Sequence, residues 1–246
     1  MTRFVHVGIA AAAVIATCLA GAPPASGSPI LLNGGFEAGF SSWTRADQLG
    51  SEGTFFLQSG TASPVNLDAV PAPPGGLIAA MTDAGAPGTH VLYQDFVVSA
   101  PSALLSFDLF LGNRAGAFVT ANPATVGLDF STAALNQQAR VDILRIGANP
   151  FSVAASDVLL NLYQTKAGDP LVSGYNRLNF DLSTLFAANA GATLRLRFAE
   201  ADNLAQFQVG LDNVSLETVD AVPEPASLVL LGTGLAAALF LRRRRS

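Results

Sequence analysis

Carboxylates are the most numerous side chains in this sequence that could perform acid–base chemistry. Four of them, Asp95, Asp108, Asp129 and Asp142, lie in segments where apolar residues alternate with polar ones. A glycosidase needs two such groups facing each other across a cleft. The spacing of these four does not predict such a pair, so a divergent glycan-active enzyme is only one of several open hypotheses.

Nucleophilic and metal-hydrolase chemistry finds little support. His90 is the only histidine after residue 28, and it begins a predicted strand. The sequence has no H-E-x-x-H pair, no G-x-S-x-G elbow and no phosphate-binding loop. A lone histidine at a strand edge is usually a solvated or structural residue, and we expect His90 not to be catalytic.

Aromatic side chains could instead serve as platforms for sugar rings. Trp43 is the only tryptophan, and Tyr93, Tyr163 and Tyr175 are the tyrosines. Trp43 stands in the segment "NGGFEAGFSSW", where it can be a core residue or an exposed platform. The tyrosines lie in or near predicted strands and are equally ambiguous.

The elements that must position these residues are mainly strands. In "ATLRLRFAE" the residues Leu194, Leu196 and Phe198 share one face, and the same alternation occurs in "NRLNFDLS" and "LLSFDLFLG". Period-two alternation indicates strands with one buried face. Further predicted strands are "GTFFLQS", "LIAAMTD", "VLYQDFVV", "TVGLDF", "ARVDILRI", "DVLLNLYQ" and "FQVGLDNVSLE". Turn residues separate these segments, and one short helix is expected over residues 183–190, so the sequence predicts an all-β, antiparallel β-sandwich.

Within the last predicted strand the alternation changes parity. Val209 and Leu211 share one face, but Val214 and Leu216 would then point the other way. A one-residue β-bulge at Asp212 and Asn213 buries both sets.

Charge and cysteine content exclude several partners. Residues 28–222 carry 8 Lys and Arg against 17 Asp and Glu, a formal net charge of −9. This balance argues against nucleic acid and anionic lipid as partners, and it is compatible with calcium or a neutral polysaccharide. The only cysteine, Cys18, lies in the N-terminal segment, so the rest of the chain can form neither disulfides nor thiolate metal sites.

The N-terminal segment has the pattern of a secretory signal peptide. Arg3 precedes an apolar run over residues 4–20, and small residues follow. Cleavage after Gly27 gives residues 1–27 as the signal helix and Ser28 as the first mature residue. A lipoprotein signal at Cys18 is the alternative, although the preceding threonine is atypical.

The C-terminal segment combines three signals in a fixed order. The triplet Pro223, Glu224 and Pro225 precedes an apolar stretch over residues 226–241. As a helix this stretch spans about 24 Å, short for a hydrocarbon core of roughly 30 Å. We nevertheless expect a transmembrane helix, with a buried core helix as the alternative. Four arginines follow this stretch: Arg242, Arg243, Arg244 and Arg245. We expect them to stay on the cytoplasmic side of the membrane and to stop translocation of the chain.

This order of triplet, helix and basic end resembles the PEP-CTERM sorting domain of Gram-negative bacteria. The resemblance implies that residues 221–246 are a sorting segment cut by an exosortase at or near the triplet. It also implies export across the inner membrane, transient anchoring by the helix, and release to the cell surface or extracellular matrix.

A second resemblance concerns residues 28–220. The opening "NGGFEAGFSSW" and the closing "FQVGLDNVSLE" resemble the first and last strands of carbohydrate-binding-module-like, or galactose-binding-like, jelly rolls. The resemblance implies a structural Ca²⁺ held by Glu37 and Asp212, with backbone carbonyl groups completing the six to eight oxygen ligands. If no ion binds, Glu37 is a surface carboxylate and Asp212 a bulge residue.

We therefore expect a non-catalytic surface or matrix protein whose partners are exosortase and an exopolysaccharide bound by the jelly-roll domain. Two alternatives stay open: a structural or adhesive matrix protein without a sugar pocket, and the divergent glycan-active enzyme. No residue can be assigned to ligand binding from the sequence.

Overall fold

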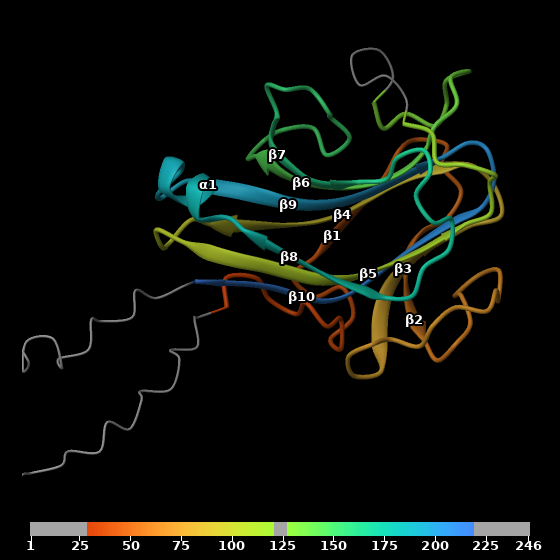
Figure 1. Ribbon diagram of the computed structural model, residues 1–246, viewed down its shortest axis with the longest axis horizontal. Helices are drawn as coiled ribbons and strands as arrows, with labels where there is room; N and C mark the ends of the chain where they lie inside the picture. Colours follow the sequence, from red (N-terminus) through yellow and green to blue (C-terminus); the bar gives the residue numbers. More distant parts are fainter. Residues whose placement is uncertain (1–28, 121–126, 219–246) are drawn as a thin grey trace, which may run out of the picture. The chain divides into compact units, whose positions relative to one another are not determined.

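A computed structural model describes residues 29–120 and 127–218 (Figure 1). The predicted signal peptide, transmembrane helix, sorting triplet and arginine cluster lie outside these residues. The described chain forms the strands β1 (Thr44–Asp47), β2 (Thr54–Ser59), β3 (Ile78–Asp83), β4 (Gly88–Val97), β5 (Ala103–Asn113), β6 (Gln137–Arg145), β7 (Val158–Gln164), β8 (Asn176–Asp181), β9 (Thr193–Asp202) and β10 (Phe207–Thr218), and one helix, α1 (Ser183–Ala188).

The strands form two antiparallel sheets that pack face to face. Their orders are β1-β4-β9-β6-β7 and β2-β3-β10-β5-β8. The strands β3 to β10 alone give β4-β9-β6-β7 opposite β3-β10-β5-β8, which is the jelly-roll arrangement, and β1 and β2 extend one side of each sheet. The predicted all-β sandwich and jelly roll are thus confirmed.

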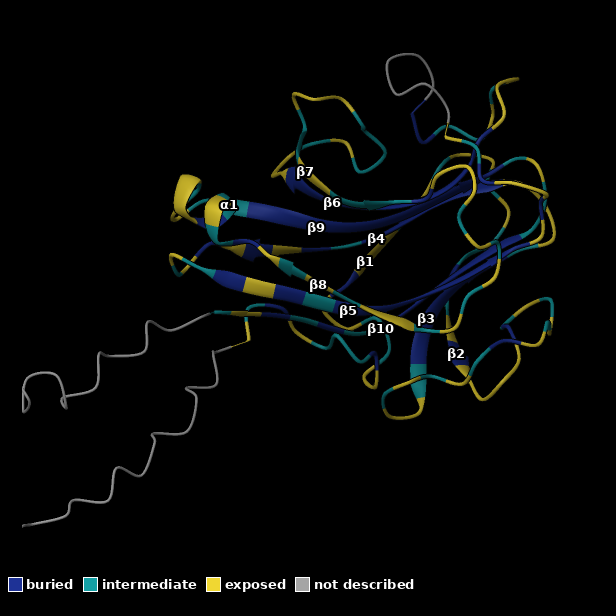
Figure 2. Ribbon diagram, viewed as in Figure 1, coloured by how far each residue is buried: buried dark blue, intermediate teal, exposed yellow. Residues whose placement is uncertain are grey.

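The hydrophobic core lies between the sheets, as the buried strand faces in Figure 2 show. Leu196, Phe198, Phe207 and Leu211 are all buried, as their alternation predicts. Phe180 is half-buried at the outer strand β8 and stacks on Phe107 with ring centroids 5.6 Å apart. Burial of such faces is the main favourable free-energy change on folding.

The bulge in β10 is confirmed. The pairing of β10 with β5 changes register between Asp212 and Ser215, and Asn213 adopts a left-handed backbone with φ of 50°. Val214 and Leu216 are therefore buried together with Leu211. The opening loop crosses this bulge, where the Val214 amide donates to the Gly34 carbonyl at 2.9 Å. A Cβ at Gly34 would lie 1.7 Å from the Val214 oxygen, so only glycine permits this approach.

Two details differ from the sequence-based prediction. Residues 127–130 of the predicted strand "TVGLDF" form bends rather than a strand, while β1 was not predicted. In β1 only Ala46 is even partly buried, so its four residues lack the apolar alternation that marks a strand. No helix within the described residues is long and apolar enough to cross a membrane.

Both ends of the described chain lie at the same end of the sandwich (Figure 1). Pro29 pairs with Glu217, and the Ile30 amide donates to the Leu216 carbonyl at 2.8 Å. The first residues of the domain thus extend its last strand.

Candidate functional site

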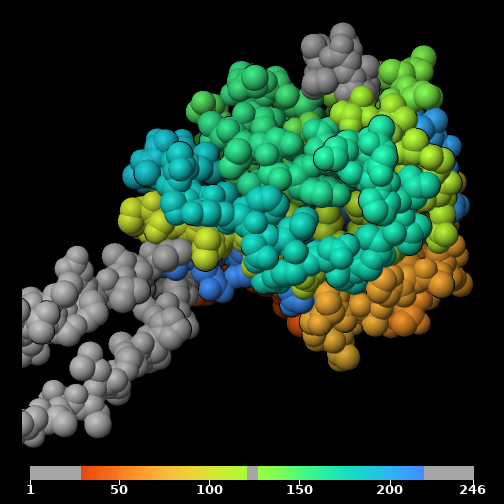
Figure 3. Space-filling view, in the orientation of Figure 1, coloured from red at the N-terminus to blue at the C-terminus, as the bar shows by residue number. Residues whose placement is uncertain are grey.

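A cavity of about 500 Å³ opens between the outer strands β7 and β8, at the side of the sandwich away from β1 and β2. Its lining residues come from β5, β7, β8 and the loop between β7 and β8: Leu109, Leu111, Leu162, Tyr163, Gln164, Lys166, Asp169, Pro170, Ser173, Asn176 and Leu178. Figure 3 shows this face, with atoms of β5 visible at the bottom of a hollow beside the loop. The volume falls within the usual range for small-ligand sites.

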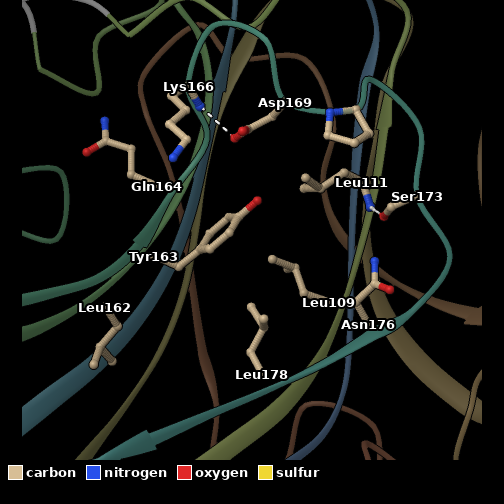
Figure 4. A pocket seen from close by; sticks show the side chains of 11 residues that line it. Leu109, Leu111, Leu162, Tyr163, Gln164, Lys166, Asp169, Ser173, Asn176 and Leu178 are labelled. Atoms are coloured by element: carbon tan, nitrogen blue, oxygen red, sulfur yellow. Dashed lines mark hydrogen bonds between the residues drawn. The ribbon is translucent and has the colours of Figure 1, made fainter.

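Apolar side chains form the floor of this cleft. Leu109 and Leu111 of β5 belong to the main core, and Leu178 of β8 packs against the same core. The ring of Tyr163 projects between them and the polar loop (Figure 4). Burial raises the pKa of Tyr163, and the nearby charge of Asp169 raises it further, so the phenol is protonated at neutral pH.

Polar groups form the rim. The Asp169 carboxylate accepts a hydrogen bond from the Lys166 amide at 2.9 Å, and the Ser173 hydroxyl accepts one from the Leu111 amide at 3.0 Å (Figure 4). Within residues 29–120 and 127–218, neither the Tyr163 hydroxyl nor the Lys166 ammonium group has a hydrogen-bond or ion-pair partner. Two donors are thus free to bind a ligand at the cleft.

The other aromatic candidates have structural roles. Trp43 is 6% exposed, and its indole donates to the Asn33 carbonyl at 3.0 Å, so it is a core residue and not a sugar platform. Tyr93 lies on the outer face of its sheet beneath the Arg195 guanidinium, 3.8 Å from the ring centroid. The Tyr175 hydroxyl donates to Gln58 at 3.1 Å. Tyr163 is therefore the one tyrosine of the described chain that lines the cleft.

The four aspartates of the predicted strands do not face one another across a cleft. Asp95 forms a two-pronged ion pair with Arg195 at 2.6 and 3.0 Å. Asp108 accepts from Asn213 at 2.7 Å, and Asp129 accepts from Ser131. Their positions therefore give no support to glycosidase chemistry.

Asp142 is the centre of a buried ionic network on the outer side of β6 and β9. It pairs with Arg140 and Arg197, and Arg197 also donates to the carbonyls of Pro150 and Ser152 in the loop that covers it. Burial raises the pKa of Asp142, but the hydrogen bonds and charges of Arg140 and Arg197 outweigh this and hold it below the usual value.

Two further carboxylates lie side by side on the inward face of β9, and sequence reasoning missed them. Glu200 and Asp202 are 1% and 5% exposed. Burial raises the pKa of Glu200 well above its usual value, and the charge of Asp202 raises it further. Burial raises the pKa of Asp202 to about 6. They continue the inward-facing parity of Leu196 and Phe198 in β9, a signal that could have revealed them. A polysaccharide cannot reach a pair enclosed in this way.

His90 lies beside this pair. It is 2% exposed, and its Nδ1 lies 2.8 Å from the Asp47 carboxylate. The expectation of a structural residue is consistent with this geometry, whereas that of a solvated one is not.

Glu37 and Asp212 contact the same short segment of backbone. Glu37 accepts hydrogen bonds from the amides of Leu77 and Ile78 at 2.8 and 3.0 Å. Asp212 is fully buried and accepts one from the Gly75 amide at 2.9 Å. The opening loop and the closing strand are therefore joined through residues 75–78.

The surroundings of Asp212 suit a cation. Burial, together with the charges of Asp108 and Glu37, raises its pKa to about 6. A bound cation would relieve this repulsion. The described residues hold no group of three or more His, Cys, Asp and Glu side chains that could hold a metal, so Ca²⁺ here would need backbone and amide oxygens as well.

Comparisons with known proteins identify one sequence family and several similar folds. Residues 221–245 match the family described as "PEP-CTERM protein-sorting motif". No curated protein matches the chain. The chain is similar in structure to TmCBM61 in complex with β-1,4-galactotriose, at 12% identity and a TM-score of 0.43, covering 78% of this chain and 99% of that one.

Two further solved structures are similar. The K3 cleaved adhesin domain of Lys-gingipain from Porphyromonas gingivalis has 15% identity and a TM-score of 0.46, with 77% and 99% of the two chains covered. The family 11 carbohydrate-binding module from Clostridium thermocellum, in complex with a mixed-linked tetrasaccharide, has 12% identity and a TM-score of 0.41, with 79% and 98% covered. At these identities and TM-scores the likeness carries no argument about a ligand.

Proposed function

Because residues 221–245 carry a PEP-CTERM sorting motif, which indicates a secreted protein sorted to the surface by exosortase, we propose that this chain binds exopolysaccharide without catalysis. The sorting signal is cut near Pro223, Glu224 and Pro225, and the domain then belongs to the cell surface or the matrix. Its jelly roll holds the polysaccharide at the cleft between β7 and β8.

One observation carries the binding proposal: the hydrophobic core opens to solvent beside two free donors, the Tyr163 hydroxyl and the Lys166 ammonium group. A sugar ring has an apolar face that stacks on an aromatic ring and hydroxyl groups that need hydrogen-bond partners. Tyr163 supplies the ring, and Lys166 and Asp169 supply polar partners at the rim.

Two observations support a non-catalytic role. The four aspartates of the predicted strands are held in ion pairs or hydrogen bonds, and the neighbouring Glu200 and Asp202 are enclosed. General acid–base catalysis needs a group within hydrogen-bond reach of the substrate.

The structural Ca²⁺ also belongs to this proposal. Glu37 and Asp212 would supply the carboxylate ligands, and the ion would strengthen the link between the opening loop and β10. The enclosed position of Asp212 near two other carboxylates supports it.

Retention on immobilised exopolysaccharide from the producing cells tests the function. The full-length chain in detergent should be retained, and Tyr163→Ala should lower retention about tenfold or more. Tyr93→Ala, on the outer face of the same sheet and away from the cleft, is the matched control and should bind like wild type. The same polysaccharide should show no new reducing ends after incubation. Absence of retention would indicate a structural matrix protein, and new reducing ends would indicate an enzyme.

A further inference from the structure

The cleft presents three different chemical surfaces to a ligand. Its floor is apolar, formed by Leu109, Leu111 and Leu178. Beside the floor lie two donors without partners among the described residues, the Tyr163 hydroxyl and the Lys166 ammonium group. At the rim the Asp169 carboxylate has one acceptor atom engaged by a backbone amide and a second oxygen available.

An ordinary hexose fits this combination poorly. Its ring carries hydroxyl groups on most carbons, and a hydroxyl pressed against leucine loses its hydrogen bonds to water without replacement. A floor of leucines selects a ligand that presents a methyl group there, since one extra methyl in an apolar pocket changes affinity by roughly 10- to 200-fold.

An acetamido group has all the complementary parts. Its methyl group suits the leucine floor, its carbonyl oxygen accepts from the Tyr163 hydroxyl or the Lys166 ammonium group, and its N–H donates to the Asp169 carboxylate. Figure 4 shows the Tyr163 ring pointing into the cavity, with Leu109 on one side and the loop of Lys166 and Asp169 on the other.

Net charge favours a neutral ligand. With 17 carboxylates against 8 basic residues between residues 28 and 222, the domain repels uronic acids and other anionic sugars. An acetamido sugar carries the extra polar group without adding negative charge.

From this complementarity we propose that the cleft binds 2-acetamido sugars, with the acetyl methyl group on the leucine floor. The proposal rests on the proposed glycan-binding function and specifies its ligand class. Tyr163, Lys166 and Asp169 determine the specificity for the acetamido group.

Ligand-observed saturation-transfer NMR on the full-length chain in detergent tests the proposal. The probes are the methyl glycosides of glucose, galactose and mannose, each paired with its 2-acetamido counterpart. At least one acetamido sugar should bind about tenfold or more tightly than its parent hexose. Its acetyl methyl protons should receive the strongest saturation.

The variant Tyr163→Phe keeps the ring and removes one donor. It should weaken binding of that acetamido sugar about 3- to 10-fold, the loss expected for one hydrogen bond, and should change the affinity of the parent hexose less than twofold. Tyr93→Phe removes the equivalent hydroxyl outside the cleft and should change neither affinity.

The outcomes distinguish a failure of the acetamido specificity from a failure of the proposed glycan-binding function. Equal affinities within every pair, or binding in which the ring protons receive more saturation than the acetyl methyl, would overturn the acetamido specificity and leave glycan binding intact. No binding of any probe, with retention on exopolysaccharide preserved, would also overturn it. Loss of retention as well would overturn both proposals.

Discussion

At the residue scale, the enclosed carboxyl pair of Glu200 and Asp202 makes the stability of the domain depend on pH. Both groups have a pKa raised by burial, that of Asp202 to about 6, against roughly 4 in an unfolded chain. The folded state therefore binds protons more tightly. The resulting stability is fully present below about pH 4 and is lost as the pH rises through 6 and above.

The urea concentration at the midpoint of unfolding should accordingly decrease as the pH is raised from 5 to 8. Glu200→Gln removes one of the two raised groups while keeping its shape, so the variant should lose less stability than wild type over this range. Glu217→Gln, on an exposed part of β10, is the control and should follow wild type. A wild-type midpoint that increases from pH 5 to pH 8 would contradict the raised pKa values of Glu200 and Asp202.

The ion pairs beside β9 allow a matched comparison. Asp142 and Arg197 are both fully buried, whereas the Asp95 side chain that pairs with Arg195 is 36% exposed. Asp142→Ala leaves buried charges unpaired and should cost about 3–5 kcal/mol of unfolding free energy. Asp95→Ala should cost about 1 kcal/mol or less, because water screens this pair.

Chemical denaturation at pH 7 measures both costs. Equal costs for Asp142→Ala and Asp95→Ala would mean that water reaches the network around Arg197 as readily as it reaches Arg195.

Single residues were predictable from sequence only where a local pattern defined their environment. The parity of β9 places Glu200 and Asp202 inward with Leu196, so simple alternation contains that information. No such pattern connects Glu37 with residues 75–78, because that contact depends on how the opening loop crosses β10. The calcium ligands came from a family resemblance and stay a prediction.

At the element scale, the register of β10 sets which leucines are in the core. Leu211 is completely buried on β10, whereas Leu104 on the neighbouring β5 is 51% exposed. Leu211→Ala should therefore lower the free energy of unfolding by about 2–5 kcal/mol. Leu104→Ala makes the same change on a solvent-facing side and should lower it by much less. Thermal unfolding followed by circular dichroism measures the difference, and coincident melting curves would disprove the register.

Strands were predictable where six or more strand-forming residues ran between turn signals, with alternation as the clearest signal, and the four-residue β1 was missed. Phe207 to Leu216 even revealed the bulge, because buried residues of both parities need one. The segment around residues 127–130 has the composition of a strand, yet Gly127 adopts a φ of 62° and Asn136 donates to the Gly127 and Asp129 carbonyls. These backbone groups are thus bonded by a side chain rather than by a neighbouring strand.

At the scale of the whole molecule, calcium would join the two ends of the domain. Binding only to the folded state stabilises it by about 2.7 kcal/mol at a hundredfold excess over Kd. The metal-stripped full-length chain should melt higher in millimolar calcium than in chelator. Glu37→Gln and Asp212→Asn should each remove most of that difference, and Glu217→Gln should not. Identical melting curves with calcium and chelator would refute the site.

We expect sorting to depend on the triplet in the matched motif and not on the fold. Changing Pro223, Glu224 and Pro225 to alanine should leave the protein uncut in the inner membrane, as shown by cell fractionation and by its larger size on a gel. The control Asp220→Ala, just upstream, should be processed normally. Release of the triple variant at the wild-type rate would show that the triplet is not the signal.

The cleft itself could not be predicted from the sequence. It exists because β7 and β8, distant from each other in the pairing order, are the outer strands on the same side of two sheets. Alternation marks Leu109 and Leu178 as core residues but does not show that the core opens beside them. The sequence alone therefore left open whether Tyr163 is a core residue or a platform for a sugar ring.

The central position of β10 determines how the domain resists a mechanical load. This strand leads toward the sorting motif. Ten of its residues pair with β5, and two of these, Gly210 and Leu211, also pair with β3. A pull along β10 from Thr218, opposed by a glycan held elsewhere on the domain, strains these hydrogen bonds side by side in shear rather than breaking them one at a time. Forced unfolding is governed by the unfolding rate, and we expect this geometry to keep that rate low. We therefore expect the domain to resist unfolding when it is pulled along β10.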